Sequence, residues 1–340
     1  MNDLRVETVR GPLVESVHQV SAVVVDADGR RVAWSGDPDM VTFWRSSAKP
    51  FQAIPLVDDG AADRFGFSED ELALACASHS SEPVHLETVD RLLAKIGCQE
   101  SDLACGGHPP LSEAVAQRVA RDGAELTPRW SNCSGNHAGM LALAVHHGWP
   151  VAGYNRRGHP VQDRVLEEVS RWTDVPVTDL QQGLDGCNTV CFGLPLANMA
   201  LAYARLGASA EPAVVRVREA MTGNPAIVGG VGRPCTDIMS AAGGTVVAKI
   251  GAEGVYGASV IGRARGDGLG IALKVRDGGM RSAPIGLIAI LQQLEDHGLL
   301  TSSSRSWLGV LEPHATVTLT NTKGLVTGEL RSAGELHVSG

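Results

Sequence analysis

The chain has 340 residues, 44% of them hydrophobic and 20% charged, and a formal net charge of -9. This composition is that of an ordinary globular protein, and the acidic balance argues against nucleic acid or an anionic membrane as a partner. Residues 1–20 lack the basic and apolar regions of a signal peptide, and no apolar run is long enough to span a bilayer. We therefore expect a cytoplasmic protein.

The elements alternate between strand and helix patterns along the chain. Val17–Val25 is an apolar run, Asp26–Gly29 gives a turn, and Arg31–Trp34 resumes the extended pattern, which predicts a β-hairpin. From Ser46 onward the periodicity is helical. The further helices expected are a capped one from Ser68 to Cys76, Pro83–Ile96, Leu111–Ala120, Ser134–His146, Pro160–Trp172, Pro195–Arg205, Pro212–Met221 and Ala283–His297.

Extended patterns return near the C-terminus. Thr245–Ile250, Val255–Ile261 and Leu269–Val275 are separated by glycine-containing turns, as in an antiparallel meander, and 317–338 is also extended. We expect an α/β (α+β) fold in one domain, 1–340, with two lobes. An antiparallel sheet from both chain ends, 1–45 and 235–340, would enclose an inserted helical lobe, 46–234. A three-layer α/β sandwich is the alternative, because strand order cannot be read from the sequence.

Three short motifs carry candidate catalytic groups: Ser46-Ser47-Ala48-Lys49, Ser78-His79-Ser80 and Lys249-Ile250-Gly251. Ser46 and Lys49 would lie one turn apart on one face of a helix start, where an unprotonated lysine can take the serine proton. The alternative is that Ser46 or Ser47 caps the helix and Lys49 is solvated. Ser78 lies in an expected loop between two helices, from which it could relay a proton or serve only as a polar loop residue.

Lys249 ends the apolar stretch 245–248, where a lysine is costly unless it is paired or functional. Gly251 would allow a close approach by substrate or backbone. Ordinary exposure of the lysine at a strand end is the alternative. The functional interpretation of all three motifs requires the Lys249 amine to meet the Ser46 hydroxyl around one cavity.

The three motifs together resemble those of the serine β-lactamase and penicillin-binding fold group and the related serine-type glutaminases. The chain more closely resembles the bacterial L-asparaginase II family of the rhizobial type, from about Val17 to Val275. The blocks that carry this resemblance are Trp44-Arg45-Ser46-Ser47-Ala48-Lys49-Pro50, residues 77–83, Asn132-Cys133-Ser134-Gly135-Asn136-His137-Ala138-Gly139-Met140, Asp185-Gly186-Cys187 and Arg233-Pro234-Cys235.

This resemblance implies hydrolysis of L-asparagine to L-aspartate and ammonia by a homodimer. Ser46 would be the nucleophile and Lys49 its base, while Ser78 and Lys249 would form a second pair that assists proton transfer. It also implies substrate-binding roles for further residues, which are Arg45, His137, Asp185 and Cys235.

The resemblance also implies zinc, held by Cys133, Cys187 and a lysine three residues after Cys133. Here that third position is Asn136, a weak zinc ligand, and His137 is the substitute to consider. Two free thiols lining the pocket are the alternative, so zinc is not expected to be required for the chemistry.

Three other functions stay open at this stage. A serine-type glutaminase would differ from an asparaginase by one methylene of substrate. A zinc-dependent amidohydrolase would attack with metal-bound water, and the serines would then only position the substrate. A non-catalytic amino-acid sensor would keep the pocket without the chemistry.

Overall fold

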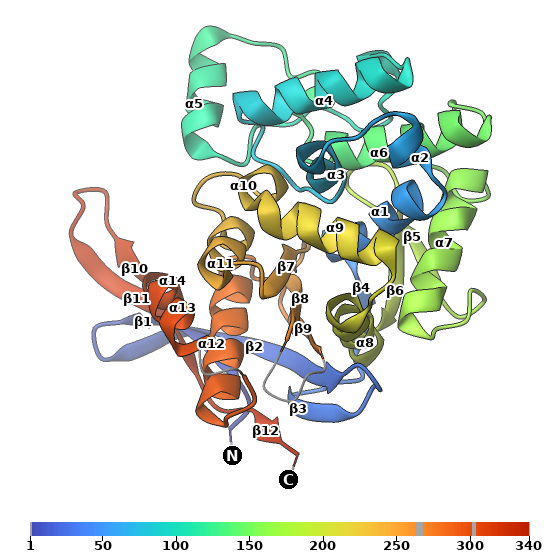
Figure 1. Ribbon diagram of the computed structural model, residues 1–340. Helices are drawn as coiled ribbons and strands as arrows, with labels where there is room; N and C mark the ends of the chain where they lie inside the picture. Colours follow the sequence, from blue (N-terminus) through green and yellow to red (C-terminus); the bar gives the residue numbers. More distant parts are fainter. Residues whose placement is uncertain (1, 263–267, 301–303, 340) are drawn as a thin grey trace. The chain divides into compact units, whose positions relative to one another are not determined.

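The computed structural model describes residues 2–262, 268–300 and 304–339, with the side chain of Ser304 outside that description (Figure 1). The chain divides into two compact units. The first contains Met1–Ser47, Leu194–Ala208 and Ile238–Gly340, and the second contains Ala48–Gly193 and Ser209–Asp237. No helix among the described residues is long and apolar enough to cross a membrane.

The first unit is built on a nine-stranded sheet whose strands come from both chain ends. Its main path runs in the order β10-β11-β1-β2-β9-β8-β7, and β3 links β2 to β12. The strands are β1 (Arg5–Arg10), β2 (Leu13–Asp26), β3 (Arg31–Ser35), β7 (Val246–Ile250), β8 (Val255–Val260), β9 (Leu269–Val275), β10 (Thr316–Thr320), β11 (Val326–Ala333) and β12 (His337–Val338). The named pairs are antiparallel, which confirms the predicted sheet class.

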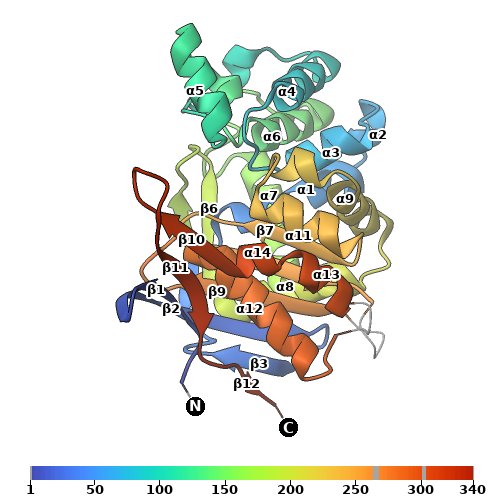
Figure 2. The ribbon, with the colours of Figure 1, turned by 90° about the vertical axis from the view of Figure 1, so that its left-hand side faces the viewer.

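Helices cover both faces of this sheet (Figures 1 and 2). Helix α8 (Leu196–Ala208) packs closely on one face: a side chain added at Gly270 would lie 1.8 Å from the Ala200 carbonyl oxygen. Helix α12 (Ser282–Asp296) packs on the other face, where Gly286 approaches Val20. Because both faces are buried there, the C-terminal half of β2 has the continuous apolar run Ala22–Val25 instead of an alternating pattern. The short helices α13 (Ser304–Val310) and α14 (Glu312–Ala315) pack against α12.

The second unit is largely helical, with α6 (Ser134–His147) at its centre. This helix contacts α1, α2, α3, α4 and α7, and Gly135 allows a close approach to Leu74. The other helices of this unit are α1 (Lys49–Asp58), α2 (Ala61–Arg64), α3 (Glu69–Ala75), α4 (Pro83–Ile96), α5 (Glu113–Asp122), α7 (Pro160–Thr173), α9 (Pro212–Gly223) and α10 (Pro225–Val228). Strand β5 (Gln181–Leu184) forms an antiparallel hairpin with β6 (Val190–Pro195), whose last two residues belong to the first unit. Strand β4 (Val41–Phe43) belongs to the first unit, and α11 (Pro234–Ala242) runs from the second unit into the first.

Most of the predicted elements are present. The Ser68–Glu71 capping box opens α3, and Gly97 ends α4 in the left-handed conformation. The start of α1 differs from the prediction. Arg45–Ala48 is a 3₁₀ turn, and Ala48 precedes the α-helix without a side-chain capping bond, so neither Ser46 nor Ser47 caps it.

Candidate active site

Lys49 is the residue around which the candidate groups of the second unit gather. It is the first residue of α1, and its side chain is buried. Its ammonium nitrogen donates to the Ala77 carbonyl at 2.6 Å, to the Ser78 hydroxyl at 3.1 Å and to the Cys133 sulfur at 3.0 Å. Three acceptors from two other segments therefore fix the position of this cation. The sequence paired Lys49 with Ser46, and the structure adds Ser78 as a direct partner.

The loop that carries Ser78 is held from several sides. The backbone N–H groups of Ser78 and His79 donate to the Val228 and Asn132 carbonyls, each at 3.0 Å. The His79 ring lies 2.9 Å from the Ser134 hydroxyl through Nε2 and stacks on the His85 ring at 5.0 Å. Burial lowers the pKa of His79 well below its ordinary value, and His85 and Lys49 lower it further. This histidine is therefore neutral and holds Ser78 in place.

Cys133 and Cys187 form a coupled pair of thiols next to Lys49. A hydrogen bond from Cys187, with the nearby charge of Lys49, lowers the pKa of Cys133 to about 5. The pKa of Cys187 is raised, because it is the donor in that bond and because it is buried. The arrangement corresponds to a Cys133 thiolate that accepts hydrogen bonds from a thiol and an ammonium group.

The Asp185–Thr189 turn brings Cys187 to this cluster. The N–H of Asp185 donates to the Thr189 carbonyl at 2.8 Å, and Asn188, with φ 70°, donates through its side chain to the Ala104 carbonyl at 2.9 Å. The half-buried Asp185 carboxylate acts electrostatically on Cys133. It therefore lies near the cluster to which the sequence assigned it.

The residues around Cys133 do not fit a tetrahedral zinc site. In the part of the chain that the structure describes, no three His, Cys, Asp or Glu side chains gather closely enough to hold a metal ion. The side-chain oxygen of Asn136 is buried and makes no hydrogen bond there, but an amide oxygen is a poor substitute for a third nitrogen or sulfur ligand. Because the Lys49 cation already contacts the Cys133 sulfur, we derive no catalytic step through zinc.

The first unit holds the remaining catalytic candidates, Ser46 and Lys249. Ser46 is half-buried in the 3₁₀ turn, and Lys249 is buried near the end of β7. The neighbouring Ser47 hydroxyl donates to the Lys249 carbonyl at 3.0 Å, and the Lys249 ammonium donates to the Ile250 carbonyl at 2.9 Å. The structure thus fastens the turn that carries Ser46 to the strand that carries Lys249. A direct contact between the Ser46 hydroxyl and the Lys249 amine stays a prediction.

Two further features fix this turn within the first unit. Tyr203 of α8 donates its hydroxyl to the Ser47 carbonyl at 2.7 Å. Gly251 lies so close to the turn that an added Cβ would be 2.9 Å from the Ser47 hydroxyl and 3.0 Å from the Trp44 carbonyl oxygen. The close approach predicted for Gly251 is therefore real, and its partner is the backbone of the serine turn.

Left-handed backbone conformations lie next to the candidate residues. Among the described non-glycine residues, positive φ angles occur at Arg45, Ser81, Asp174, Asn188 and Glu253. Arg45 precedes Ser46, Ser81 follows the Ser78 loop, and Asn188 follows Cys187. Such conformations cost free energy and are concentrated at functional sites. Their positions support a functional role for these segments.

Of the predicted contact residues, His137 and Cys235 lie in the second unit, as Asp185 does, and Arg45 lies in the first. His137 is fully buried in α6, and Cys235 is buried in the first turn of α11. The adjacent Thr236 hydroxyl contacts the Gly230 carbonyl at 2.7 Å, and the Ser80 hydroxyl donates to the Gly229 carbonyl at 2.9 Å. The loop before α11 is therefore tied to the loop that carries Ser78.

Sequence reasoning missed Tyr154, Ser47 and Tyr203 as supporting residues. Tyr154 contacts His137, while Ser47 and Tyr203 secure the serine turn. A lone tyrosine in a turn-rich segment or in an apolar helix carries no local signal of such a role. Ser47 lay within the motif, but the three-residue spacing to Lys49 selected Ser46 and left Ser47 only the role of a possible helix cap.

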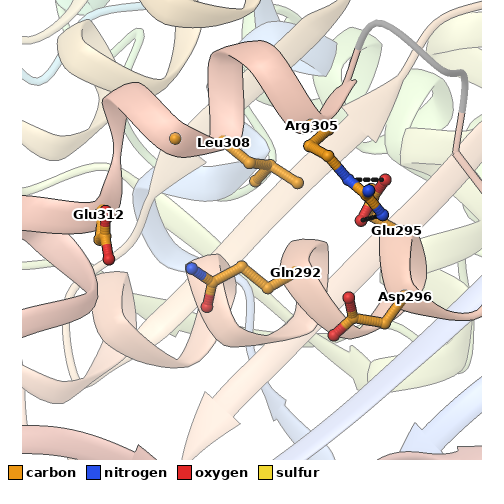
Figure 3. A pocket seen from close by; sticks show the side chains of 7 residues that line it. Gln292, Glu295, Asp296, Arg305, Leu308 and Glu312 are labelled. Carbon is orange, nitrogen blue, oxygen red and sulfur yellow. Dashed lines mark hydrogen bonds and ion pairs between the residues drawn. The ribbon is translucent and has the colours of Figure 1, made fainter.

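An open pocket elsewhere in the first unit contains none of the candidate residues. It has a volume of about 290 Å³ and lies among α12, α13 and α14 (Figure 3). Glu295, Asp296 and Glu312 line it, and Arg305 pairs with Glu295 at 3.1 Å. The lining residues that the structure describes include no serine, threonine, cysteine or lysine.

Comparisons with known proteins identify a family for this chain. The family model of L-asparaginase II matches residues 6–332. A comparison with curated proteins gives no match. Among solved structures, the chain is similar to the Bacillus subtilis glutaminase YbgJ in its covalent complex with 5-oxo-L-norleucine, with 15% identity, a TM-score of 0.36, and coverage of 87% of this chain and 93% of that one.

A second similar structure is Mglu in its L-glutamate binding form. The identity is 17% and the TM-score is 0.35, with coverage of 87% of this chain and 64% of that chain. The family model, in contrast, extends over nearly the whole sequence, including all the candidate site residues. This chain belongs to the L-asparaginase II family.

Proposed function

We propose that this family hydrolase cleaves L-asparagine to L-aspartate and ammonia through a serine acyl-enzyme. The main support is the contact of Lys49 with Ser78, because it links the lysine of the first motif to the serine of the second. A serine requires a base to become nucleophilic, and lysine supplies one when it is neutral. Membership of the family supports asparagine as the substrate.

In the proposed reaction, Lys49 first gives a proton to the adjacent Cys133 thiolate. The Ser46 oxygen then attacks the side-chain amide carbonyl of asparagine, and the neutral Lys49 takes the hydroxyl proton. The C–N bond then breaks, and the nitrogen leaves as ammonia with a proton returned through Lys49 and Ser78. Water next attacks the aspartyl ester, which releases L-aspartate and restores Ser46. Lys249 assists the proton transfers in this scheme, and Arg45, His137, Asp185 and Cys235 contact the substrate.

We propose no step that requires zinc. The Cys133 thiolate instead helps to hold Lys49, because the two groups form an ion pair within hydrogen-bond distance. We further propose that the enzyme is a cytoplasmic homodimer, which the resemblance of its motifs supports. Light scattering of the purified protein would test the dimer.

Ammonia release from a panel of small amides that includes L-asparagine and L-glutamine tests the function. We expect L-asparagine to give the highest kcat/KM, with L-glutamine lower by about 10-fold or more for one added methylene. Exhaustive chelation should leave turnover unchanged. Higher turnover of glutamine would make the protein a glutaminase, loss of activity on chelation would support a zinc hydrolase, and thermal stabilisation by asparagine without ammonia would support a sensor.

A further inference from the structure

A small open pocket of about 220 Å³ lies between α4 and α5, within the second unit. Its apolar wall is made by Pro83, Leu86 and Trp130. Two groups of opposite charge also line it: Glu87 comes from α4 and Arg118 from α5. A pocket of this size, with an apolar wall and a few charged groups, suits a small polar ligand.

The charges of this pocket divide into a satisfied pair and two groups that remain available. Arg129 and Asp90, which also line it, form an ion pair at 2.9 Å. The side chains of Glu87 and Arg118 are exposed, and neither makes a hydrogen bond or an ion pair with any residue that the structure describes. One carboxylate and one guanidinium group therefore line the same pocket without a partner from the described chain.

A ligand that satisfies both groups must carry both charges. A guanidinium group binds a carboxylate through two parallel N–H donors, and a carboxylate accepts hydrogen bonds from an ammonium group. An α-amino acid carries its carboxylate and its ammonium group on the same carbon atom. A simple carboxylic acid would engage Arg118 alone, and a simple amine would engage Glu87 alone.

We propose that this pocket binds a free, zwitterionic α-amino acid with a small side chain. Its carboxylate contacts Arg118 and its ammonium group contacts Glu87. L-Asparagine and L-aspartate belong to this class of ligand, but the site does not depend on the proposed reaction. Because exposed ion contacts are individually weak, we expect a Kd on the order of 1 mM.

An amino acid in this pocket would fasten α5 to α4. Helix α5 buries Val115 and Val119, and its other side chains are partly or fully exposed. Elements with so few buried apolar groups open easily, so its amide protons should exchange readily in the free protein. A ligand held by Arg118 and Glu87 at once joins the two helices and should slow this exchange.

The wall of the pocket continues into the loop that carries Ser78. The N–H of Ser81, another lining residue, donates to Nδ1 of His79 at 3.2 Å. On the other side of that ring, Nε2 lies 2.9 Å from the Ser134 hydroxyl, which donates to the Arg129 carbonyl at 3.0 Å. His79 is therefore tied to two residues of the pocket wall and is next to Ser78 in the chain, so an occupied pocket should change turnover.

NMR titration of the full-length protein with glycine tests the site, because glycine has no side-chain amide to hydrolyse. The indole N–H signal of Trp130 reports on the pocket and is identified by its loss in Trp130→Phe. We expect this signal to shift with glycine, but not with glycinamide, which lacks the carboxylate, or with N-acetylglycine, which lacks the ammonium group. A signal that ignores glycine, or that responds equally to all three compounds, would overturn the proposal.

Variants of the two charged residues separate this pocket from the catalytic groups. Arg118→Gln and Glu87→Gln should each weaken glycine binding by about 5-fold or more and remain folded, because neither side chain makes a bond in the free protein. The matched control Arg121→Gln changes an exposed arginine of the same helix outside the pocket and should bind glycine like the wild type. Wild-type binding by Arg118→Gln would overturn the proposal.

Two further measurements test the consequences of binding. Glycine should slow hydrogen exchange of residues 113–122 in the wild type and not in Arg118→Gln, and unchanged exchange in the wild type would overturn the link between the helices. Saturating glycine should change kcat for L-asparagine in the wild type and not in Arg118→Gln, and an unchanged kcat would overturn the effect on turnover. Failure to hydrolyse asparagine, with glycine bound as expected, would overturn only the proposed function.

Discussion

The Lys49 ammonium nitrogen lies 3.1 Å from the hydroxyl oxygen of Ser78, although the two residues belong to separate motifs. The same nitrogen contacts the Ala77 carbonyl and the Cys133 sulfur. A cation with three fixed acceptors has little freedom to leave the site. This arrangement supports a proton path in which Ser78 exchanges protons with Lys49, the lysine that we propose as the base for Ser46.

Replacement of Ser78 by alanine should therefore slow turnover without unfolding the protein. We expect kcat to fall by about 10²–10⁴, the range for loss of a proton-transfer group. Lys49 keeps two of its acceptors, so the free energy of unfolding should fall by only about 1 kcal/mol. Steady-state ammonia release and urea unfolding measure the two effects. The control Ser81→Ala loses a hydrogen bond to the Trp130 carbonyl in the same loop and should lack the large loss of kcat.

Gly251→Ala should displace the turn that carries Ser46. The added methyl group would lie 2.9 Å from the Ser47 hydroxyl and 3.0 Å from the Trp44 carbonyl oxygen. The backbone can make room for it only if the turn itself is displaced. Because a misplacement of about 1 Å can cost about 10²-fold in rate, we expect a large fall in kcat. The control Gly223→Ala, at a position with open space around it, should leave kcat at the wild-type value. A fully active Gly251→Ala would show that the turn does not position the nucleophile.

The backbone of Arg45 provides a separate test of strain beside Ser46. Its φ of 53° is a conformation that glycine adopts without cost and alanine does not. Arg45→Gly should therefore be more stable than Arg45→Ala by about 1 kcal/mol. Both variants lose the guanidinium group, so their difference isolates the backbone. Equal unfolding free energies in urea would show that the turn relaxes when the side chain is removed.

Stability should fall as the pH is lowered below the ordinary pKa of histidine. Burial, with the charge of Lys49, lowers the pKa of His137 from 6.5 to about 3. Between these values the unfolded chain binds a proton that the native protein does not, so each pH unit lost costs up to about 1.4 kcal/mol from this residue. The stability from the neutral histidine is complete above pH 6.5 and declines towards pH 3.

Urea unfolding at several pH values between 7.5 and 5 checks this expectation. His79, whose pKa is also lowered, contributes in the same direction and remains in the variant. His137→Gln should therefore show a smaller decline of unfolding free energy with falling pH than the wild type. Parallel declines in the two proteins would contradict the assignment of this pH dependence to His137.

The sequence predicted those elements whose ends carry local signals. The capping box of Ser68 and Glu71 and the glycine at position 97 mark helix ends by chemistry that acts within a few residues. Strand β1, with the sequence Arg-Val-Glu-Thr-Val-Arg, was not predicted. Its charged residues interrupt the apolar pattern that would mark a strand. Its place between β2 and β11 depends on pairing with the far end of the chain, which no local pattern predicts.

The candidate site shows the same division between local and distant information. The motifs identified Lys49, Ser78 and Cys133 as residues of interest, but not that one ammonium group contacts the other two. The α8 pattern predicted a helix, but not the place where it packs. That place depends on glycines of the sheet, such as Gly257 and Gly270, whose missing side chains leave room for the helix. Tyr154 acts through a single hydroxyl contact with His137, for which a sequence offers no periodicity.

The paired variants Ser46→Ala and Ser47→Ala test the central claim most directly, with ammonia release from L-asparagine as the measurement. Ser47 donates its hydroxyl to the Lys249 carbonyl, so its loss should lower stability and leave a measurable turnover. Ser46→Ala should lower kcat by about 10⁴-fold or more while the protein remains folded, because no nucleophile is left to form the ester. Turnover by Ser46→Ala close to that of the wild type would contradict the account.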